Sequence, residues 1–170
     1  CATCDGFFFR NQEIAVVGGG DSAVTEAQFL SRFGTTVHVI HRRDELRASQ
    51  IMADRLLAND KVKMHWNSVV ESINGSAKLD SLTLRDTVTG ETRELPVTGL
   101  FVAIGHEPRT EFIKGQIALD DKGYITVAEP STATSVPGVF ACGDVVDSHY
   151  QQAITAAGMG CKACLLYTSP

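Results

Sequence analysis

An apolar run that ends in three consecutive glycines constrains the fold of this chain more than any other feature of its sequence. Residues 13–17 (Glu-Ile-Ala-Val-Val) have the nearly continuous apolar character of a buried parallel strand. Glycines at 18–20 follow at once, and small or apolar residues then recur at helical spacing from Asp21 to Phe33. A strand, a tight turn and a helix in this order predict a βαβ unit within an α/β fold.

Further elements follow from the same kinds of pattern. Residues 36–40 are β-branched and predict a strand, and residues 48–58 predict a second amphipathic helix. Short segments then alternate with Asn74-Gly75 and Thr89-Gly90, which are turn sequences of antiparallel hairpins. We therefore expect a meander built from residues 62–66, 69–73, 79–86 and 92–95. The apolar run at 100–104 predicts another parallel strand.

A domain boundary is expected near residues 106–110, where Glu107-Pro108-Arg109 interrupts the pattern. Beyond it, residues 117–127 predict a small β-rich piece, residues 138–141 a strand and residues 151–164 a helix rich in alanine and glycine. The predicted fold is thus a Rossmann-like unit with an antiparallel β-meander, followed by part of a second unit.

Charge and composition exclude several classes of partner. The formal net charge of −5 argues against binding to nucleic acid or anionic membrane. No apolar run approaches the roughly 20 residues that a membrane-spanning helix needs. Five cysteines in a short chain could indicate a disulfide scaffold, but long apolar strands and a Gly-rich loop are typical of a cytosolic α/β protein. We therefore expect a cytoplasmic protein that binds neither nucleic acid nor membrane.

The Gly-rich turn has the form G-x-G-x-x-A and indicates a dinucleotide site. Gly18 permits the tight turn, Gly20 lets the backbone approach a pyrophosphate, and Ala23 is small enough for close packing of helix and strand. The helix start at Asp21 and Ser22 offers N–H groups to the phosphates. The alternative is a glycine corner with no ligand.

A basic cluster stands where many NAD-binding proteins carry an acidic residue, at the end of the second strand. Guanidinium groups suit a dianionic 2′-phosphate, because they make charge-assisted and often bidentate hydrogen bonds. The cluster predicts NADPH as the cofactor and consists of His41, Arg42, Arg43 and Arg47. The alternative is a solvated basic helix start paired with the acidic residues at 44 and 45.

Cys1 and Cys4 form a Cys-x-x-Cys pair, which indicates a redox-active dithiol. At a helix N-terminus such a pair gains thiolate character, the form that carries out disulfide exchange. Asp5 is placed to hold or donate the accompanying proton. A structural zinc site is the alternative, with Cys161 and Cys164 as the second ligand pair, but no histidines stand at finger spacing. Cys142 is expected to be an inert buried thiol on a strand.

Taken together, these segments resemble one family, the low-molecular-weight, flavin-dependent thioredoxin reductases of bacteria. The resemblance covers nearly the whole chain to residue 162, with its motifs in the family's order. The matching segments are 1–6 (CATCDG), 16–23 (VVGGGDSA), 41–47 (HRRDELR), 99–108 (GLFVAIGHEP), 138–145 (GVFACGDV) and 152–158 (QAITAAG).

The resemblance implies two domains and two cofactors, NADPH and FAD. Residues 1–109 would be the NADPH-binding domain with its redox dithiol, and residues 110–163 the C-terminal part of the FAD-binding domain, a second Rossmann-like domain. The N-terminal half of the FAD domain would then be missing, so we expect the isolated chain to be inactive and not to hold FAD. Further cofactor-binding roles are implied for Ile104, Gly105, Gly143, Asp144, Gln151, Gln152 and Ala153. Many relatives have arginine where this chain has Gln151.

The resemblance also implies a route for electrons. Hydride would pass from NADPH to FAD, and electrons from FAD to a Cys1–Cys4 disulfide, with Cys4 nearest the flavin and Asp5 as the acid. Cys1 would attack the protein substrate, oxidised thioredoxin. Known members rotate one domain during this cycle, and residues 106–108 would form part of the hinge. Because relatives are commonly homodimers, we expect a homodimer in the full-length protein.

Two questions stay open from the sequence. Residues 164–170 (CLLYTSP) match the translation of a sequencing adapter, which predicts a non-native tail and would make the second Cys-x-x-Cys an artefact; a divergent natural C-terminus is the alternative. The partner is also open, because the flavoprotein reductase of a peroxide-reducing system has the same dithiol and nucleotide motifs. A non-catalytic NADP-binding module is a third possibility.

Overall fold

The structure is a computed structural model that describes residues 2–168, so that Cys1, Ser169 and Pro170 lie outside the described residues. Two compact units divide the chain, the first ending at Gly105 and the second beginning at His106. No helix among residues 2–168 is long and apolar enough to cross a membrane.

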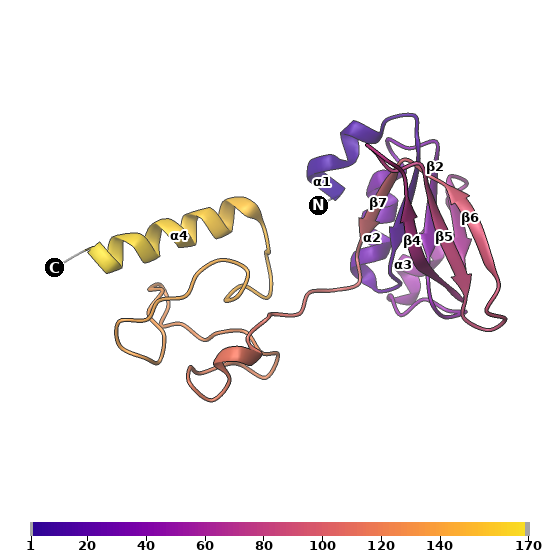
Figure 1. The fold of residues 1–170 in the computed structure, drawn as a ribbon. Helices are drawn as coiled ribbons and strands as arrows, with labels where there is room; N and C mark the ends of the chain where they lie inside the picture. Colours follow the sequence, from indigo (N-terminus) through magenta and orange to yellow (C-terminus); the bar gives the residue numbers. More distant parts are fainter. Residues whose placement is uncertain (1, 169–170) are drawn as a thin grey trace. The chain divides into compact units, whose positions relative to one another are not determined.

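The first unit contains a four-stranded parallel sheet, which confirms the predicted α/β, Rossmann-like fold (Figure 1). Its strand order is β3-β2-β1-β7. These strands are β1 (Glu13–Val17), β2 (Thr36–Ile40), β3 (Val62–His65) and β7 (Gly99–Val102). Helices α2 (Asp21–Leu30) and α3 (Gln50–Leu57) connect β1 to β2 and β2 to β3, so the parallel pairs arise from βαβ crossovers.

Alternating residues of the parallel sheet build two separate cores. One face packs fully buried Ile14, Val16 and Val37 against Leu30 of α2 and Leu56 of α3. The other face packs against the three-stranded antiparallel sheet, whose order is β4-β5-β6. That second core consists of Ala15, Ile40, Leu82, Leu84, Leu95 and Val97. Successive side chains of a strand point to opposite faces of the sheet, so one strand contributes apolar residues to both cores.

The antiparallel sheet is formed by β4 (Ser68–Asn74), β5 (Ser81–Asp86) and β6 (Thr92–Pro96). The prediction that residues 62–66 belong to this meander is wrong. Residues 62–65 instead pair in parallel with β2, because helix α3 returns the chain to the sheet that it left. Asn67, with a positive φ of 48°, then turns the chain from one sheet to the other. Helix α2 also ends three residues earlier than predicted, where the Gly34 N–H donates to the Leu30 carbonyl.

A short helix carries the second cysteine of the dithiol motif. Helix α1 (Ala2–Asp5) continues into the 3₁₀ helix η1 (Gly6–Phe9), and together they pack on the end of α2 (Figure 1). Ala2 and Gly6 face inward; a Cβ atom at Gly6 would lie 2.9 Å from the Leu30 side chain. Because these small residues face α2, Cys4 and Asp5 are exposed.

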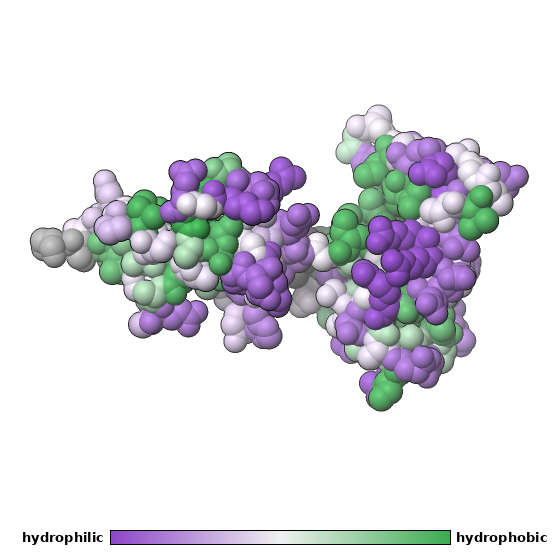
Figure 2. Space-filling view, turned by 90° about the horizontal axis from the view of Figure 1, so that it is seen from below, coloured by the Kyte–Doolittle hydropathy of each residue, from purple (hydrophilic) through white to green (hydrophobic). Residues whose placement is uncertain are grey.

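The second unit contains less regular structure. It has the 3₁₀ helix η2 (Glu111–Ile113) and the long helix α4 (Ala153–Thr168), which includes residues 164–168 of the predicted non-native tail. The strand predicted at 138–141 is wrong, since only Phe140 makes a bridge, with Ala133. A turn closed by the Val139 N–H and the Val136 carbonyl, with Gly138 at φ 79°, leaves little length for pairing. Residues 117–127 contain one antiparallel bridge, Leu119 to Ile125. Figure 2 shows hydrophobic side chains on the surface of this unit, where Ile154, Leu165 and Tyr167 of α4 are exposed.

Candidate functional site: a cavity at the carboxyl ends of the parallel strands

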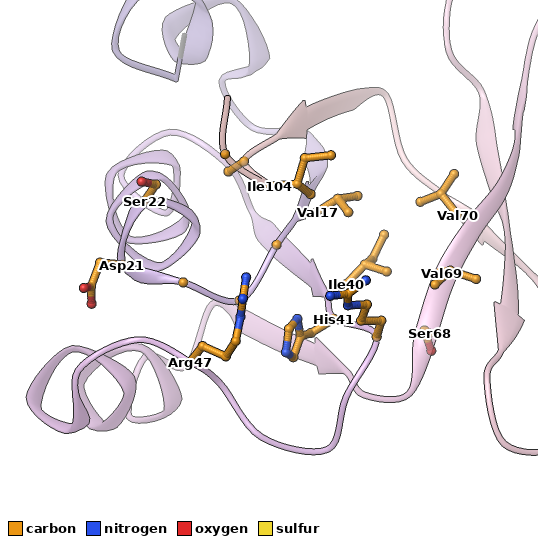
Figure 3. A pocket seen from close by; sticks show the side chains of 16 residues that line it. Val17, Asp21, Ser22, Ile40, His41, Arg47, Ser68, Val69, Val70 and Ile104 are labelled. Carbon is orange, nitrogen blue, oxygen red and sulfur yellow. The ribbon is translucent and has the colours of Figure 1, made fainter. Parts of the chain in front are cut away.

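A cavity of about 710 Å³ opens where β1, β2 and β7 end, and the first residues of β4 form one wall (Figure 3). This is the position where ligands bind in open α/β sheets. It brings together nine of the residues that the sequence predicted as cofactor-binding, namely Gly18, Gly20, Asp21, Ser22, His41, Arg42, Arg47, Ile104 and Gly105. Ala23 and Arg43 are not among its lining residues; Ala23 is buried in α2 and Arg43 is exposed.

The turn between β1 and α2 depends on its first two glycines. Gly18 has a φ of 149°, and a Cβ atom there would lie 2.3 Å from the Ala103 carbonyl oxygen and 2.7 Å from the Ala23 Cβ. At Gly19 a Cβ atom would lie 2.2 Å from the imidazole carbon Cε1 of His41. The turn therefore packs directly against the end of β7, the first turn of α2 and the His41 ring.

Gly20 differs from these two, because a Cβ atom there would meet no protein atom within 4 Å. It is the N-cap residue of α2, and its carbonyl accepts the first helical hydrogen bond, from the Val24 N–H at 3.1 Å. The open space lies at a helix N-terminus, where N–H groups and the helix dipole favour an anion. The absence of a side chain leaves the backbone accessible to a ligand.

His41 is the most distinctive side chain of the cavity. Its exposed fraction is 5%, yet its Nε2 atom is buried without a hydrogen-bond partner among the described residues. Burial lowers the pKa of His41, and the positive charges of Arg47, Arg42 and Arg43 lower it further, against a hydrogen bond to the Glu45 backbone. An unpartnered polar atom of this kind costs free energy unless a ligand or water satisfies it.

Two arginines line the cavity together with His41. Figure 3 shows the Arg47 side chain beside His41, and Arg42 also lines the cavity. The loop that carries Arg47 is fixed to the glycine turn, because the Arg47 and Ala48 N–H groups donate to the Gly19 carbonyl at 2.7 and 3.1 Å. The arrangement concentrates positive charge at the end of β2, as the sequence led us to expect.

Asp21 has a structural contact that the sequence did not predict. Its Oδ1 accepts a hydrogen bond of 2.8 Å from the Ser49 N–H, at the N-cap of α3. The carboxylate thus joins the first turn of α2 to the N-cap of α3, and Asp21 is among the residues that line the cavity. This contact spans 28 residues, which explains why local pattern alone could not find it.

The sequence also missed the apolar walls of the cavity. Val17, Ile40, Val69, Val70 and Ala103 line it, and Ser68 adds a hydroxyl (Figure 3). Val17, Ile40 and Ala103 stand at the carboxyl ends of parallel strands, which was a usable signal. Val69 and Val70 gave none, because they reach the cavity only through the packing of one sheet on the other.

Cys4 and Asp5 lie outside this cavity. The described residues that line it include none from α1, and Cys4 and Asp5 are exposed. Cys1 lies outside the described residues. Cys142 is only partly buried and belongs to no strand, so the expectation of a buried thiol on a strand is wrong. Cys161 and Cys164 are exposed on α4, and no group of three or more His, Cys, Asp or Glu side chains among residues 2–168 is placed to hold a metal ion.

The remaining predicted cofactor-binding residues lie in the second unit. Asp144, exposed, and Gln151 line a cavity of about 350 Å³ there; Gly143, Gln152 and Ala153 do not line it. Gln151 has a positive φ of 51° and its side-chain amide donates to the Tyr124 hydroxyl at 3.0 Å.

One carboxylate, from Asp147, organises the turn before α4. It accepts hydrogen bonds from the backbone N–H groups of His149, Tyr150 and Gln151. These bonds, chiefly the one from Tyr150, hold the pKa of the Asp147 carboxyl below its usual range. No motif in the sequence marks Asp147, because its partners are backbone N–H groups.

The fold and the cavity define an α/β protein with a dinucleotide-type site, and the comparison with known proteins specifies its class. The family model for pyridine nucleotide-disulphide oxidoreductases matches residues 1–160, so the chain belongs to this family.

Its similar relatives are thioredoxin reductases, which confirms the resemblance predicted from the motifs. Thioredoxin reductase of Streptomyces clavuligerus is 64% identical over 165 residues, which are 97% of this chain and 51% of the relative. That of Mycolicibacterium smegmatis is 59% identical over 97% of this chain and 53% of the relative. The crystal structure of thioredoxin reductase from Streptococcus pyogenes MGAS5005 superposes with a TM-score of 0.83 at 44% identity, covering 96% of this chain and 53% of that one. The chain thus spans about half the length of the curated relatives it matches.

Proposed function

We propose that the cavity of the first unit binds NADP(H), with the 2′-phosphate against His41, Arg42 and Arg47. The observation that carries this proposal is the buried Nε2 of His41, which has no partner among the described residues although it lies beside two arginines. A dianionic phosphate beside His41 would favour the protonated imidazole, whose Nε2–H would then donate to a phosphate oxygen, and the guanidinium groups would neutralise the phosphate charge. The open backbone at Gly20 and the start of α2 fit the pyrophosphate.

A protein that contains this chain would use the nucleotide for disulfide reduction, and we propose thioredoxin-disulfide reductase as its activity. Support comes from the family, from relatives at 59–64% identity that bear that name, and from the Cys-x-x-Cys motif. NADP(H) supplies a hydride equivalent, and FAD is the expected carrier between nucleotide and dithiol. The chain's own part is to bind the nucleotide and to present Cys1 and Cys4 for exchange with a substrate disulfide.

In this proposal the two sulfurs divide the exchange between them. The Cys1 thiolate attacks the disulfide of oxidised thioredoxin, so that one thioredoxin sulfur leaves as a thiolate and the other becomes bonded to Cys1. The Cys4 thiolate then attacks the Cys1 sulfur, which releases the second thioredoxin thiolate and forms the Cys1–Cys4 disulfide. The net transfer is two electrons and two protons from dithiol to disulfide. Asp5, exposed and next in sequence, is the proposed proton carrier.

The surface next to the dithiol suits a protein partner. Phe7 and Phe8 follow the motif and are exposed by 59% and 71%, with their rings in edge-to-face contact. The Arg10 guanidinium lies 5.0 Å from the centre of the Phe7 ring. Exposed aromatic residues with an arginine are the side chains that most often anchor protein interfaces. We propose that thioredoxin docks on this surface.

We propose two domains for a protein that contains this chain. Residues 1–109 would form the NADPH-binding domain and residues 110–163 part of the FAD-binding domain, in which Asp144 would bind the ribityl chain and Gln151, Gln152 and Ala153 would face the flavin. Gly143, with a φ of 81°, permits a close backbone approach next to Asp144. We also propose a homodimeric, cytoplasmic protein.

Isothermal titration calorimetry of the 170-residue chain with NADP⁺ and NAD⁺ tests the nucleotide proposal. We expect tighter binding of NADP⁺, and the variant Arg47→Gln should remove most of that preference because it removes a charge at the 2′-phosphate. Arg55→Gln, on α3 and outside the cavity lining, is the matched control. Equal affinity for both nucleotides would overturn the proposal.

The activity needs a second experiment on the protein with its full complement of domains. NADPH oxidation is followed with oxidised thioredoxin present and absent. We expect turnover only with thioredoxin, and none in the variant Cys4→Ser, which should still bind NADP⁺. Turnover by Cys4→Ser at the unmodified rate would exclude the dithiol from the reaction.

A further inference from the structure

A chain of hydrogen-bonded side chains crosses the first unit between its two sheets. The Arg93 Nη2 on β6 lies 3.2 Å from His65 Nδ1, and His65 Nε2 lies 2.9 Å from His38 Nδ1. His38 Nε2 in turn lies 2.7 Å from the Glu13 carboxylate on β1. The same Arg93 nitrogen donates to the Ser68 hydroxyl at 3.0 Å.

The guanidinium of Arg93 determines which atom donates in each hydrogen bond of this series. A guanidinium nitrogen only donates, so His65 Nδ1 must accept from Arg93. Neutral His65 then carries its hydrogen on Nε2 and donates it to His38 Nδ1. His38 carries its hydrogen on Nε2 and donates it to Glu13. Two neutral imidazoles thus connect one cation to one anion, and Arg93 determines the tautomer of both rings.

The Arg93 end of this series of hydrogen bonds lies next to the residues that hold His41. The His41 N–H donates to the His65 carbonyl at 3.0 Å, and the Ser68 N–H donates to the His41 carbonyl at 2.9 Å. His65 and Ser68 are therefore the two residues that hold the backbone of His41, and Arg93 binds the side chains of both. Ser68 is 1% exposed, and its hydroxyl donates to the Trp66 carbonyl. The turn between β3 and β4 is therefore buried and hydrogen-bonded at Ser68.

We propose that Arg93 is a positioning residue for the nucleotide cavity, because its guanidinium fixes His65 and Ser68 and thereby orients His41 toward a 2′-phosphate. This rests on the proposed binding of NADP(H). Arg93 does not line the cavity and would not contact the nucleotide. Its effect is on the preference for a 2′-phosphate over a 2′-hydroxyl, because His41 lies among the arginines that would bind that phosphate. Contacts to the pyrophosphate at the glycine turn would not depend on it.

The neighbouring strand offers a matched control. Arg85 on β5 belongs to the same antiparallel sheet, where it pairs with Thr92 in register. Its side chain follows Leu84, which faces the core, and so lies on the opposite face of the sheet, in an ion pair with Glu71 at 3.2 Å. Arg85→Ala therefore removes a charge and an ion pair from the sheet without touching His65 or Ser68.

Calorimetric titration of the 170-residue chain with NADP⁺ and NAD⁺ compares the unmodified protein with three variants. Arg93→Ala should lower the ratio of the two affinities about tenfold, which corresponds to ~1.4 kcal/mol, because a displaced His41 would lose its hydrogen bond to the charged 2′-phosphate and such bonds contribute about that much. Arg93→Lys should restore part of the ratio, because an ammonium group also donates to both partners. Arg85→Ala should leave it unchanged. An unaltered ratio in Arg93→Ala, or an equal loss in Arg85→Ala, overturns the proposal.

Long-range ¹H–¹⁵N NMR of the imidazole rings supplies a readout that does not need the nucleotide. The unmodified protein should show His65 and His38 as Nε2–H tautomers, and Arg93→Ala should lose that assignment at His65. If the tautomers are unaffected, Arg93 does not position His65, and the proposal is overturned. If the tautomers change but the unmodified chain has no preference for NADP⁺, the proposed function fails while the structural role of Arg93 stands.

Discussion

The half-buried His65 ring makes the stability of the first unit depend on pH. The pKa of His65 is lowered from 6.5 to about 4, chiefly by burial and then by electrostatic interactions with His38, Arg93 and Lys63. Between these two values the unfolded chain binds a proton that the folded protein does not. Stability from this group is therefore present above the unfolded pKa and is lost as the pH falls toward 4.

The size of the effect follows from the two pKa values. A pKa lowered from 6.5 to about 4 corresponds at most to ~3.4 kcal/mol, and ~1.8 kcal/mol of it would be lost between pH 7 and pH 5. Solvent screening reduces this figure, because the ring is only partly buried. We therefore expect His65 to account for ~1 kcal/mol of the stability lost between pH 7 and pH 5.

Urea unfolding of the unmodified chain and of His65→Gln, each at pH 7 and at pH 5, measures this contribution. A glutamine amide accepts from Arg93 and donates to His38 as the imidazole does, but it does not titrate in this range. The only tryptophan of the sequence, Trp66, is adjacent to His65, so its fluorescence reports on the first unit. His106→Gln removes an exposed imidazole of the other unit and serves as the control.

Only the difference between the two pH values is compared, so a loss of stability in His65→Gln at pH 7 does not affect the result. His41, whose pKa is also lowered, contributes with the same sign but equally in both proteins. The reasoning is refuted if His65→Gln loses as much stability between pH 7 and pH 5 as the unmodified chain. It is also refuted if the unmodified chain becomes more stable as the pH falls.

Three further predictions concern the turn, the core and the surface. Gly19→Ala should lower both the melting temperature and the affinity for NADP⁺, because its Cβ would lie 2.2 Å from the His41 ring. Gly20→Ala should leave the melting temperature unchanged, because a Cβ there meets no protein atom within 4 Å, but it should weaken NADP⁺ binding in calorimetry. Leu84→Ala, at a fully buried position, should cost about 2–5 kcal/mol in urea unfolding. If thioredoxin docks as proposed, Phe8→Ala in a protein that contains this chain should raise the KM for thioredoxin and leave NADP⁺ binding unchanged, since this side chain is 71% exposed and lies outside the cavity.

Local sequence pattern was sufficient for three strands of the parallel sheet, β1, β2 and β7, and for the glycine turn. The apolar runs at β1 and β2, the glycines between β1 and α2 and the helical spacing of α2 all indicate the same βαβ unit. It failed at β3, which has the length and composition of a meander strand; its parallel pairing is determined by the crossover through α3. It failed again at residues 138–141, because strand formation depends on a paired neighbour and the described residues provide one bridge.

The site was predictable to the same extent and for the same reason. Glycines and arginines at the ends of strands carry a signal in the sequence itself, because ligands of open α/β sheets bind there. The contact of Asp21 with Ser49 and the contacts of Arg93 with His65 and Ser68 carry none, because they join residues 25 to 28 positions apart. Hydrogen bonds at such separations exist only once both sheets are packed.

The residues that would contact the 2′-phosphate and the residue that would position them lie in different parts of the sequence, and this matters for cofactor selectivity. His41 and Arg47 belong to a segment that matches the family's motif, whereas Arg93 belongs to a meander strand that the motifs do not include. If Arg93 orients His41 as proposed, two proteins with the same basic cluster can differ in their preference for a 2′-phosphate through the residue at the position of Arg93 alone. Transfer of arginine to that position in a relative that lacks it should then raise the ratio of NADP⁺ to NAD⁺ affinity, provided that the relative has the equivalents of His65 and Ser68 to receive the guanidinium.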